Sequence, residues 1–580
     1  PSHWKDELIT SILLAGNAYE FLEQLGNDIF ENNNNLLIRF CFMLQIACKD
    51  PNYCLLKELG YSNSEAYFYG SSFLEPIGQG WPDLIRFLYQ NKEKLDSSFI
   101  PYVKPVLTDW TSKVAVGKQA PECTREAGLL GIHFLDFLKG AYNEDEVIEL
   151  VKVVIRAYGE IKEEVNKKLE NQLFGAERKN YGRHYQYIET FCELVLSSLD
   201  CSHISYIDPE LVVRISWQWW KIEDEDKEND PYGHRREVTE DFGFKNNYSR
   251  RSYSPECAIK GPFFSLLKAD SKVALNYIIN LCNYAAEKYV SSKRFDNEIY
   301  LTEIQLPASD KIELINSDRL WMGYRSNSVV PSFLRCSLMA LEKWLVEVES
   351  KRESFSSTLT YIIEHSNSVL PISLIVGLAP EFWPKMGDVI YSILKVRDFY
   401  SIDHQRMLTE YAEGVLDFLN WDTSPEATIY NKERKDSNSY KWRSKHLEDV
   451  VRNMIITEGY NVKVSEIIDE FKKSLPVLEQ QTHEDKTWRI ALLRMDMRKF
   501  KPEVDKKNDQ IIFHPPEPEE DIKKIQKCVK TDHNLMNRHL MLKTWGMQKF
   551  QGEKVSSDYP DWMTAFEEVK WFFKESFSDD

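Results

Sequence analysis

Apolar residues recur at helical spacing along most of the chain, and the segment after Asn143 is the clearest example. Its apolar positions follow one another at steps of four and three residues: Val147, Val151, Val154, Tyr158, Ile161 and Val165. Glutamate and lysine fill most of the other positions, which is the pattern of a helix with one buried face. The run is too short to favour a coiled coil. We therefore predict a single helix here that packs against a neighbouring helix.

Similar patterns predict further helices over residues 8–14, 18–25, 35–47, 84–91 and 128–138. Three glycines, Gly26, Gly60 and Gly140, stand where helices are expected to end. Helices of roughly 10 to 20 residues with short connections are typical of stacked antiparallel pairs.

An internal repeat supports the same architecture. The run Asn327–Pro331 (NSVVP) returns 40 residues later as Asn367–Pro371 (NSVLP), and two leucine pairs keep this offset, Leu334 with Leu374 and Leu338 with Leu378. Two helices and their turns occupy about 40 residues, which is the unit of HEAT-like solenoids. The Ser or Asn can cap the following helix, with the proline in its first turn. We therefore expect an all-α, HEAT/TPR-like α-solenoid of stacked helix pairs.

One segment departs from helical spacing. Residues 297–306 largely alternate apolar and polar side chains, a turn follows at Pro307–Asp310, and residues 312–315 are again mostly apolar. This pattern predicts a small β-hairpin insertion near 297–316. Insertions in solenoids commonly lie on one face, where they can shape a binding surface.

Composition shifts divide the chain into five expected parts. They are a helical-repeat segment (1–220), an acidic and Arg/Tyr-rich loop (221–256), a helical-repeat segment with the hairpin (257–500), a Pro/Glu-rich linker (501–521) and a C-terminal helical segment (522–580).

Charge and cysteine usage narrow the function classes. Acidic residues number 91 against 73 basic ones, a net charge of −18, which disfavours general nucleic-acid binding because phosphates attract clustered Lys and Arg. The ten cysteines form no CxxC pair, and Cys41 lies in an apolar helical run, as a buried free thiol would.

Charges or prolines interrupt every long apolar run, so no segment is expected to span a bilayer. We expect a cytoplasmic protein. The first residues form no signal peptide, and because the sequence starts at Pro1 without an initiator Met, we expect either part of a longer polypeptide or a processed chain.

Catalytic motifs are not found. Gly117-Lys118 is followed by Gln119 rather than Ser or Thr, and neither H-E-x-x-H nor G-x-S-x-G occurs. Asp561 and Glu568-Val569-Lys570 resemble the acidic and acidic-x-Lys elements of metal-dependent nucleases, but they are close together and their segment has a helical pattern. The sequence therefore predicts no catalytic, cofactor-binding or metal-binding residue in this chain.

Aromatic and arginine residues near position 220 are the candidate partner-binding residues. They are Trp217, Trp219, Trp220, Arg235, Arg236, Tyr248, Arg250, Arg251 and Tyr253. Arginine and aromatic residues are enriched at protein-binding hot spots, and the same mixture can hold single-stranded nucleic acid. The alternative interpretation is structural, with the tryptophans in the core and the arginines paired to nearby acids.

Several sequence blocks resemble a known family. They are Gly261–Leu267 (GPFFSLL) with Asn276–Asn283 (NYIINLCN), Leu320–Arg325 (LWMGYR), Ala340–Leu345 (ALEKWL) and His365–Val369 (HSNSV). Together they resemble the helical region downstream of the NTPase domain in bacterial STAND-type P-loop ATPases, including the antiviral (AVAST) group. The resemblance covers roughly residues 261–398.

The resemblance implies a sensor region in which helical repeats bind a phage protein and an ATPase oligomerises in response. ATP and Mg²⁺ would then belong to an NTPase domain outside this chain, so no catalytic residue is carried over. Two other hypotheses remain: a constitutive scaffold or assembly subunit of a multiprotein complex, and a nucleic-acid-processing protein. The partner and the oligomeric state are left open.

Overall fold

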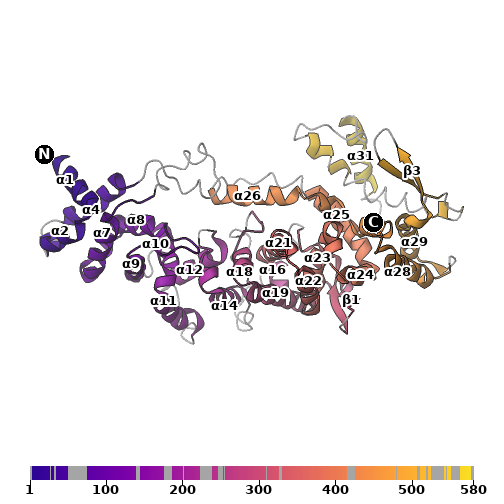
Figure 1. Ribbon diagram of the computed structural model, residues 1–580, viewed down its shortest axis with the longest axis horizontal. Helices are drawn as coiled ribbons and strands as arrows, with labels where there is room; N and C mark the ends of the chain where they lie inside the picture. The colour runs from indigo at the N-terminus through magenta and orange to yellow at the C-terminus, as the bar shows by residue number, and fades with distance from the viewer. Residues whose placement is uncertain are drawn as a thin grey trace. The chain divides into compact units, whose positions relative to one another are not determined.

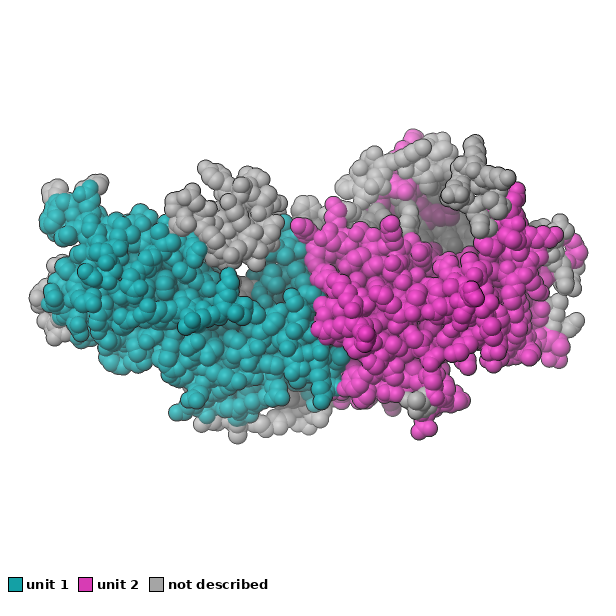
Figure 2. Space-filling model, in the orientation of Figure 1, with its two compact units in different colours: residues 1–278, 423–430 teal, residues 279–422, 431–580 magenta. Residues whose placement is uncertain are grey.

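The computed structural model describes most of the chain. The described residues are 3–26, 28–31, 34–49, 75–138, 144–175, 186–199, 201–222, 238–245, 253, 255–307, 310–325, 330–413, 425–477, 480–505, 510–516, 520, 522–523, 525, 541–543, 545–549 and 562–575. They fall into two compact units, coloured separately in Figure 2, which are described one at a time. Unit 1 comprises residues 1–278 and 423–430, and unit 2 comprises residues 279–422 and 431–580. Helix α19 (Ser271–Ser291) and helix α26 (Pro425–Asn438) each contribute residues to both units.

Unit 1 is built from short helices that follow one another along the chain (Figure 1). They are α1 (His3–Ala15), α2 (Ala18–Leu25), α3 (Asp28–Glu31), α4 (Asn34–Ala47), α7 (Gly80–Gln90), α8 (Ile100–Thr111), α9 (Thr124–Phe137), α10 (Glu144–Arg156), α11 (Lys162–Leu169), α12 (Gln186–Ser197), α13 (Ile204–Ile207), α14 (Pro209–Trp220), α16 (Val238–Asp241) and α18 (Phe263–Ala269).

These helices stack in two rows. In one row α4 contacts α1 and α8, and α10 contacts α8 and α12, which in turn contacts α14. In the other row α7 contacts α2 and α9. Each interior helix thus buries an apolar stripe against neighbours on two sides, as in a solenoid of helix pairs. This is the arrangement that the helical periodicity predicts.

Close packing in unit 1 depends on small residues at two contacts. A Cβ atom added to Gly80 would lie 2.8 Å from the carbonyl oxygen of Leu13, and one added to Gly128 would lie 2.6 Å from the Cβ atom of Ala157. Real Cβ atoms do not approach other atoms so closely, so α7 and α9 can reach their neighbours only with glycine at these positions.

The apolar run 147–165 forms two helices rather than the single helix predicted. Helix α10 ends at Arg156, a 3₁₀ turn covers Tyr158–Glu160, and α11 begins at Lys162. All six apolar residues of the run are nevertheless buried. The Tyr158 hydroxyl donates to the Asp208 carboxylate at 2.9 Å and lies 3.0 Å from the Asn166 side chain, which anchors the turn. The spacing of the apolar residues could not reveal that one helix ends and another begins, because both helices present their apolar residues to the same core.

Unit 2 is also built mainly from helices. Its main helices are α20 (Asp318–Met322), α21 (Ser332–Glu347), α22 (Phe355–Glu364), α23 (Val369–Phe382), α24 (Val389–Leu394), α25 (Asp398–Glu413), α27 (Leu447–Ile455), α28 (Asn461–Ser474), α29 (His483–Met495) and α31 (Trp562–Glu575). Helix α23 lies at the centre, in contact with α20, α21, α22, α25 and α27. It is apolar on all sides and buried from Val369 to Pro380, as a core helix must be.

The predicted hairpin is confirmed. Strand β1 (Tyr300–Gln305) pairs antiparallel with β2 (Lys311–Asn316), and Thr302 lies opposite Leu314. One face of the hairpin contributes Ile304 and Leu314 to the core, while the other face carries the exposed pair Glu303 and Lys311. The alternating pattern predicted this separation of faces.

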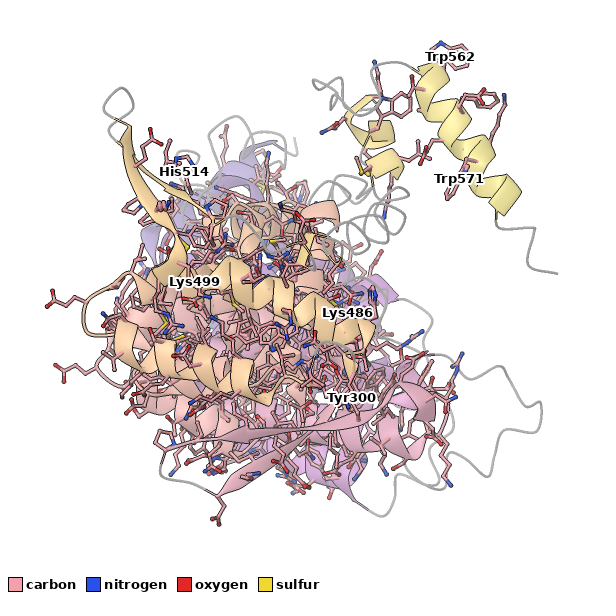
Figure 3. The ribbon with its side chains drawn as sticks, turned by 90° about the vertical axis from the view of Figure 1, so that its right-hand side faces the viewer. Tyr300, Lys486, Lys499, His514, Trp562 and Trp571 are labelled. Atoms are coloured by element: carbon pink, nitrogen blue, oxygen red, sulfur yellow. The ribbon has the colours of Figure 1, made fainter. Side chains whose placement is uncertain are left out.

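A second hairpin was not predicted. Strands β3 (Lys501–Asp505) and β4 (Gln510–His514) pair antiparallel within the segment 501–521, which we expected to be a linker. The prolines led to the wrong prediction. Pro502 lies inside β3, where proline is tolerated because both strands of a two-stranded hairpin are edge strands. His514, labelled in Figure 3, lies at the end of β4 and contacts the Glu503 carboxylate at 2.7 Å.

The repeat motif is only partly realised as predicted. Leu334 and Leu338 on α21, and Leu374 and Leu378 on α23, are all buried, and the two helices are in contact. Pro371 occupies the first turn of α23, whereas Pro331 precedes α21 as its N-cap residue. The Ser368 side chain makes no capping hydrogen bond, which corrects the predicted capping role. Residues 326–329 lie outside the described residues.

Asn367 connects helix α19 and strand β2 instead. Its amide nitrogen Nδ2 donates to Glu287 at 2.8 Å, and its backbone N–H donates to the Asn283 side chain on α19 at 3.0 Å. Its carbonyl accepts the backbone N–H of Ile315 in β2 at 2.8 Å. The motif therefore ties the hairpin to the helices.

The described part of the chain is thus an all-α stack of helices with small β insertions. Within it, no helix is both long enough and apolar enough to cross a bilayer.

Candidate interaction surfaces

The predicted residues Trp220 and Tyr253 lie in the core of unit 1. Their side chains are 5% and 2% exposed. The Trp220 ring contacts Tyr253 edge-on and stacks on Phe263, with centroids 6.1 Å and 5.9 Å apart, and Phe263 in turn stacks on Tyr277. The Tyr253 hydroxyl donates to the carbonyl of Leu196. A partner could not reach these two rings without opening the core, so the structural interpretation holds for both.

Trp217 and Trp219 are half-buried and remain candidate partner-binding residues. Trp217 contacts Tyr277 edge-on with ring centroids 6.2 Å apart, so one side of its ring belongs to the same aromatic cluster. The other predicted residues, Arg235, Arg236, Tyr248, Arg250 and Arg251, lie outside the described residues, as does most of the acidic loop from residue 223 onwards.

Unit 2 has a second aromatic surface that the sequence did not single out. The rings of Trp383 and Tyr460 meet edge to face with centroids 4.7 Å apart, and both side chains are half-buried. Trp383 follows directly after α23, and Tyr460 lies in the turn between α27 and α28. The two residues are 77 positions apart in the chain, so only the tertiary structure brings them together.

Exposed apolar and basic side chains accompany this pair. Ile456 and Val462, on either side of Tyr460 in the sequence, are 52% and 64% exposed. The Lys463 ammonium lies over the Tyr391 ring, 4.7 Å from its centroid, and pairs with Asp388 at 3.1 Å. We call Trp383, Tyr391, Ile456, Tyr460, Val462 and Lys463 the Trp383 surface.

A buried network of ion pairs holds the interior of unit 2. Arg443, on the short turn between α26 and α27, donates to Glu342 of α21 at 2.7 Å and lies 3.5 Å from Glu410 of α25. Arg406 donates to Glu410 at 3.0 Å and to Asp403 at 2.6 Å. All five side chains are more than nine-tenths buried.

Two further contacts complete this network. Arg325, after α20, lies 3.5 Å from Glu342 and donates to Ser437 at 2.9 Å. The second oxygen of Asp403 accepts the backbone N–H of Leu447 at 2.9 Å and so caps α27. The network therefore fixes the relative positions of α20, α21, α25 and α27.

The network controls the protonation of its own members. Burial by itself would raise the pKa of Glu342, but Arg443 and Arg325 outweigh it, so the pKa is lowered and Glu342 stays ionised. Burial would likewise lower the pKa of Arg443, but Glu342 and its neighbours raise it well above the ordinary arginine value. Three arginines and three carboxylates thus neutralise one another, as buried charges must.

Eight cysteines among the described residues lie in the core, and all eight are buried. Burial raises the pKa of the Cys41 thiol to about 12 and that of Cys123 to about 11, so both remain protonated and unreactive at neutral pH.

The nuclease-like pattern at the C-terminus lies on a helix. Glu568 and Lys570 belong to α31, rather than to strands that would hold a metal ion, and Asp561 lies outside the described residues. Across the described ranges no group of three or more His, Cys, Asp or Glu side chains is placed to hold a metal ion. Figure 3 shows the Trp562 side chain standing out from α31.

No protein-family model matches this chain, and no curated protein matches it.

Proposed function

We propose that this chain is the protein-recognition region of a larger bacterial antiviral NTPase of the STAND type, and that its helical repeats bind a phage protein. Sensing would then be relayed to an ATPase and effector outside this chain, in the cytoplasm, and ATP and Mg²⁺ would bind there. The resemblance of residues 261–398 to such proteins supports the family assignment. The described elements in that range, from α18 to α24, belong to the helical stack that such a region requires.

The Trp383 surface carries the proposal that the chain binds a protein. Interfaces are enriched in Trp, Tyr and Arg at their centres, with apolar neighbours that exclude water. Here a half-buried Trp and Tyr are held in one geometry, and Ile456 and Val462 stand exposed near Tyr460 in the sequence. Holding the rings in place reduces the entropy that binding would otherwise cost.

The buried ion network supports the proposed binding role because it holds the helices that carry the Trp383 surface. Helix α23, which precedes Trp383, contacts both the turn that carries Arg443 and helix α27, which precedes Tyr460. Asp403 of the network caps α27, and α27 packs against α23, so the network helps to hold the spacing of the two rings. Binding surfaces built on rigid elements are more selective than those built on loops alone.

Two valines provide a matched test of this surface. Val462 on the Trp383 surface is 64% exposed, and Val477, elsewhere in unit 2, is 60% exposed. The tagged full chain would be mixed with purified phage structural proteins, and binding would be measured by biolayer interferometry. We expect Trp383→Ala to weaken binding of the true partner by roughly tenfold or more, as loss of a hot-spot side chain does. Val462→Ala removes less apolar area and should weaken binding severalfold. Val477→Ala should leave it unchanged.

Two outcomes would contradict the proposal. If no phage protein in a broad panel binds the chain, the sensor function is wrong. If a stable partner is instead recovered from uninfected cells, and Val462→Ala weakens that complex, the chain is a constitutive scaffold subunit that uses the same surface.

A further inference from the structure

The hydrogen bonds of β2 show which backbone groups of the β1–β2 hairpin point outward. The backbone N–H of Ile315 donates to the carbonyl of Asn367 at 2.8 Å, so it points away from β1. Ile315 lies opposite Leu301, and this pair therefore exchanges no hydrogen bonds. The N–H and C=O groups of Leu301 must then point away from β2. Because the direction alternates along a strand, those of Glu303 point the same way.

Strand β1 is thus an edge strand that can accept a further strand. Within the described ranges, no backbone hydrogen bond reaches the outward groups of Leu301 or Glu303. The pairing with β2 runs without a bulge from Tyr300 to Gln305. Proline, lysine and bulges are common devices that block an edge, and β1 contains none of them. Figure 1 shows the strand at the margin of the helices of unit 2.

The exposed face of the hairpin carries an excess of negative charge beside this edge. Glu303 and Glu313 lie directly opposite each other, and both are exposed. They form a pair without hydrogen bonds, in which side chains are close, so their charges repel each other. Lys311 pairs with Glu303 at 2.6 Å and offsets only one of the two charges. A cation on the outer side of Glu303 would balance the second.

Further acidic groups lie near the start of β1. Burial raises the pKa of the Tyr300 phenol, and nearby negative charges raise it further. These charges belong to Asp318, Asp398 and Glu484. The whole chain has a net charge of −18, so its field also attracts a basic partner. Leu301, which is 61% exposed, adds an apolar contact at the same edge.

A second copy of β1 fits this edge poorly. Antiparallel pairing about a twofold axis centred on Glu303 would place this residue opposite its own copy. Centring the axis on Thr302 would place Leu301 opposite Glu303. The first arrangement brings like charges together, and the second sets an apolar side chain against a charge. The charge of β1 therefore opposes self-association and favours a basic partner.

We infer that β1 binds an extended segment of a basic partner protein, which adds a third strand to the hairpin. The outward N–H and C=O groups of Leu301 and Glu303 bond the backbone of the segment, as in other cases of strand addition. A lysine or arginine of the segment lies opposite Glu303, and an apolar residue two positions away lies opposite Leu301. None of these residues belongs to the Trp383 surface, so this inference and the proposed function can fail independently.

Fluorescence anisotropy with a dye-labelled peptide and the full chain tests the inference. A peptide of about eight residues spans β1; it has threonine at every second position, with lysine and valine alternating between. We expect it to bind at least about fivefold more tightly than the same peptide with glutamate in place of lysine. Glu303→Lys should reverse this preference. Glu470→Lys, which makes the same charge change at an exposed position of α28, should leave it unchanged.

Methylation of the peptide backbone separates strand addition from charge attraction alone. In the added strand the N–H groups of lysine and valine face β1, and those of threonine face away. N-methyl groups on lysine and valine should therefore abolish binding, whereas N-methyl groups on threonine should be tolerated. Circular dichroism would verify that Glu303→Lys folds, as expected because its lysine lies opposite Glu313.

Four results would overturn the inference. They are no binding of the lysine peptide up to about 1 mM, equal effects of the two methylation patterns, a preference that Glu303→Lys does not change, and a dimer of the chain that Glu303→Lys alters in sedimentation velocity. The last result would assign the edge to a second copy.

Discussion

The Arg443 guanidinium donates a hydrogen bond of 2.7 Å to the Glu342 carboxylate, although the two residues are 101 positions apart and both side chains are almost completely buried. Burying two charges costs several kcal/mol per ion, and mutual attraction offsets this only when both partners are present. The pair therefore specifies which helices pack together more than it adds net stability.

Removing one partner should be far more harmful than removing both. We expect Arg443→Met to lower the free energy of unfolding by about 3–5 kcal/mol, because Glu342 would remain charged and buried. Adding Glu342→Met should recover part of this loss, which a double-mutant cycle with urea denaturation would measure. Strictly additive losses would show that the two side chains do not interact as described.

Asp496 should make the protein sensitive to acid. Burial would raise its pKa, but hydrogen bonds from Arg498, at 2.7 Å, and from Lys472 outweigh this and lower the pKa to about 2. A carboxyl group whose folded pKa is depressed stabilises the fold above its unfolded pKa of about 4, and this contribution is lost as the pH falls towards 2.

The contribution of Asp496 should be roughly 1–2 kcal/mol, because Arg498 and Lys472 are partly exposed and solvent screens the interaction. Asp496→Asn should therefore reduce stability at pH 7 but flatten its decline between about pH 4 and pH 2. Guanidinium denaturation at several pH values would measure both effects. Parallel pH profiles for the variant and the unaltered protein would contradict the assignment.

Trp220 and Trp219 should respond differently to truncation. Trp220 is buried among Tyr253 and Phe263, so Trp220→Ala should cost about 3–5 kcal/mol through lost packing and a residual cavity. Trp219 is half-buried, and Trp219→Ala should cost clearly less. Thermal denaturation of the two variants makes the comparison, and equal losses would show that the two rings are equally buried.

Cys41 and Cys282 should resist alkylation in the folded protein. Burial raises the pKa of both thiols, to about 12 for Cys41, so the reactive thiolate of Cys41 is on the order of one part in ten thousand at pH 8. Peptide mapping after iodoacetamide treatment should find both unmodified until a denaturant is added. Rapid labelling of either residue under native conditions would mean that its helix opens readily.

The local pattern of the sequence determined the class of elements in this protein. Helical spacing of apolar residues predicted helices such as α4 and α9, and alternation predicted the β1–β2 hairpin, because each signal depends on residues a few positions apart. The same reasoning failed at Tyr158–Glu160, where two helices bury apolar residues against one core and keep a common period across a turn. It also failed at β3–β4, where prolines at sheet edges resembled a linker.

Only the tertiary structure decided which residues meet. Trp220 and Trp219 are neighbours in the chain, yet the packing of Phe263 and Tyr253 places the first in the core and leaves the second half-buried. The pairing of Glu342 with Arg443, and of Trp383 with Tyr460, likewise requires helices distant in sequence to stack in one order. Periodicity shows that a helix has a buried face, but the neighbour that covers this face is chosen by the packing of the whole unit.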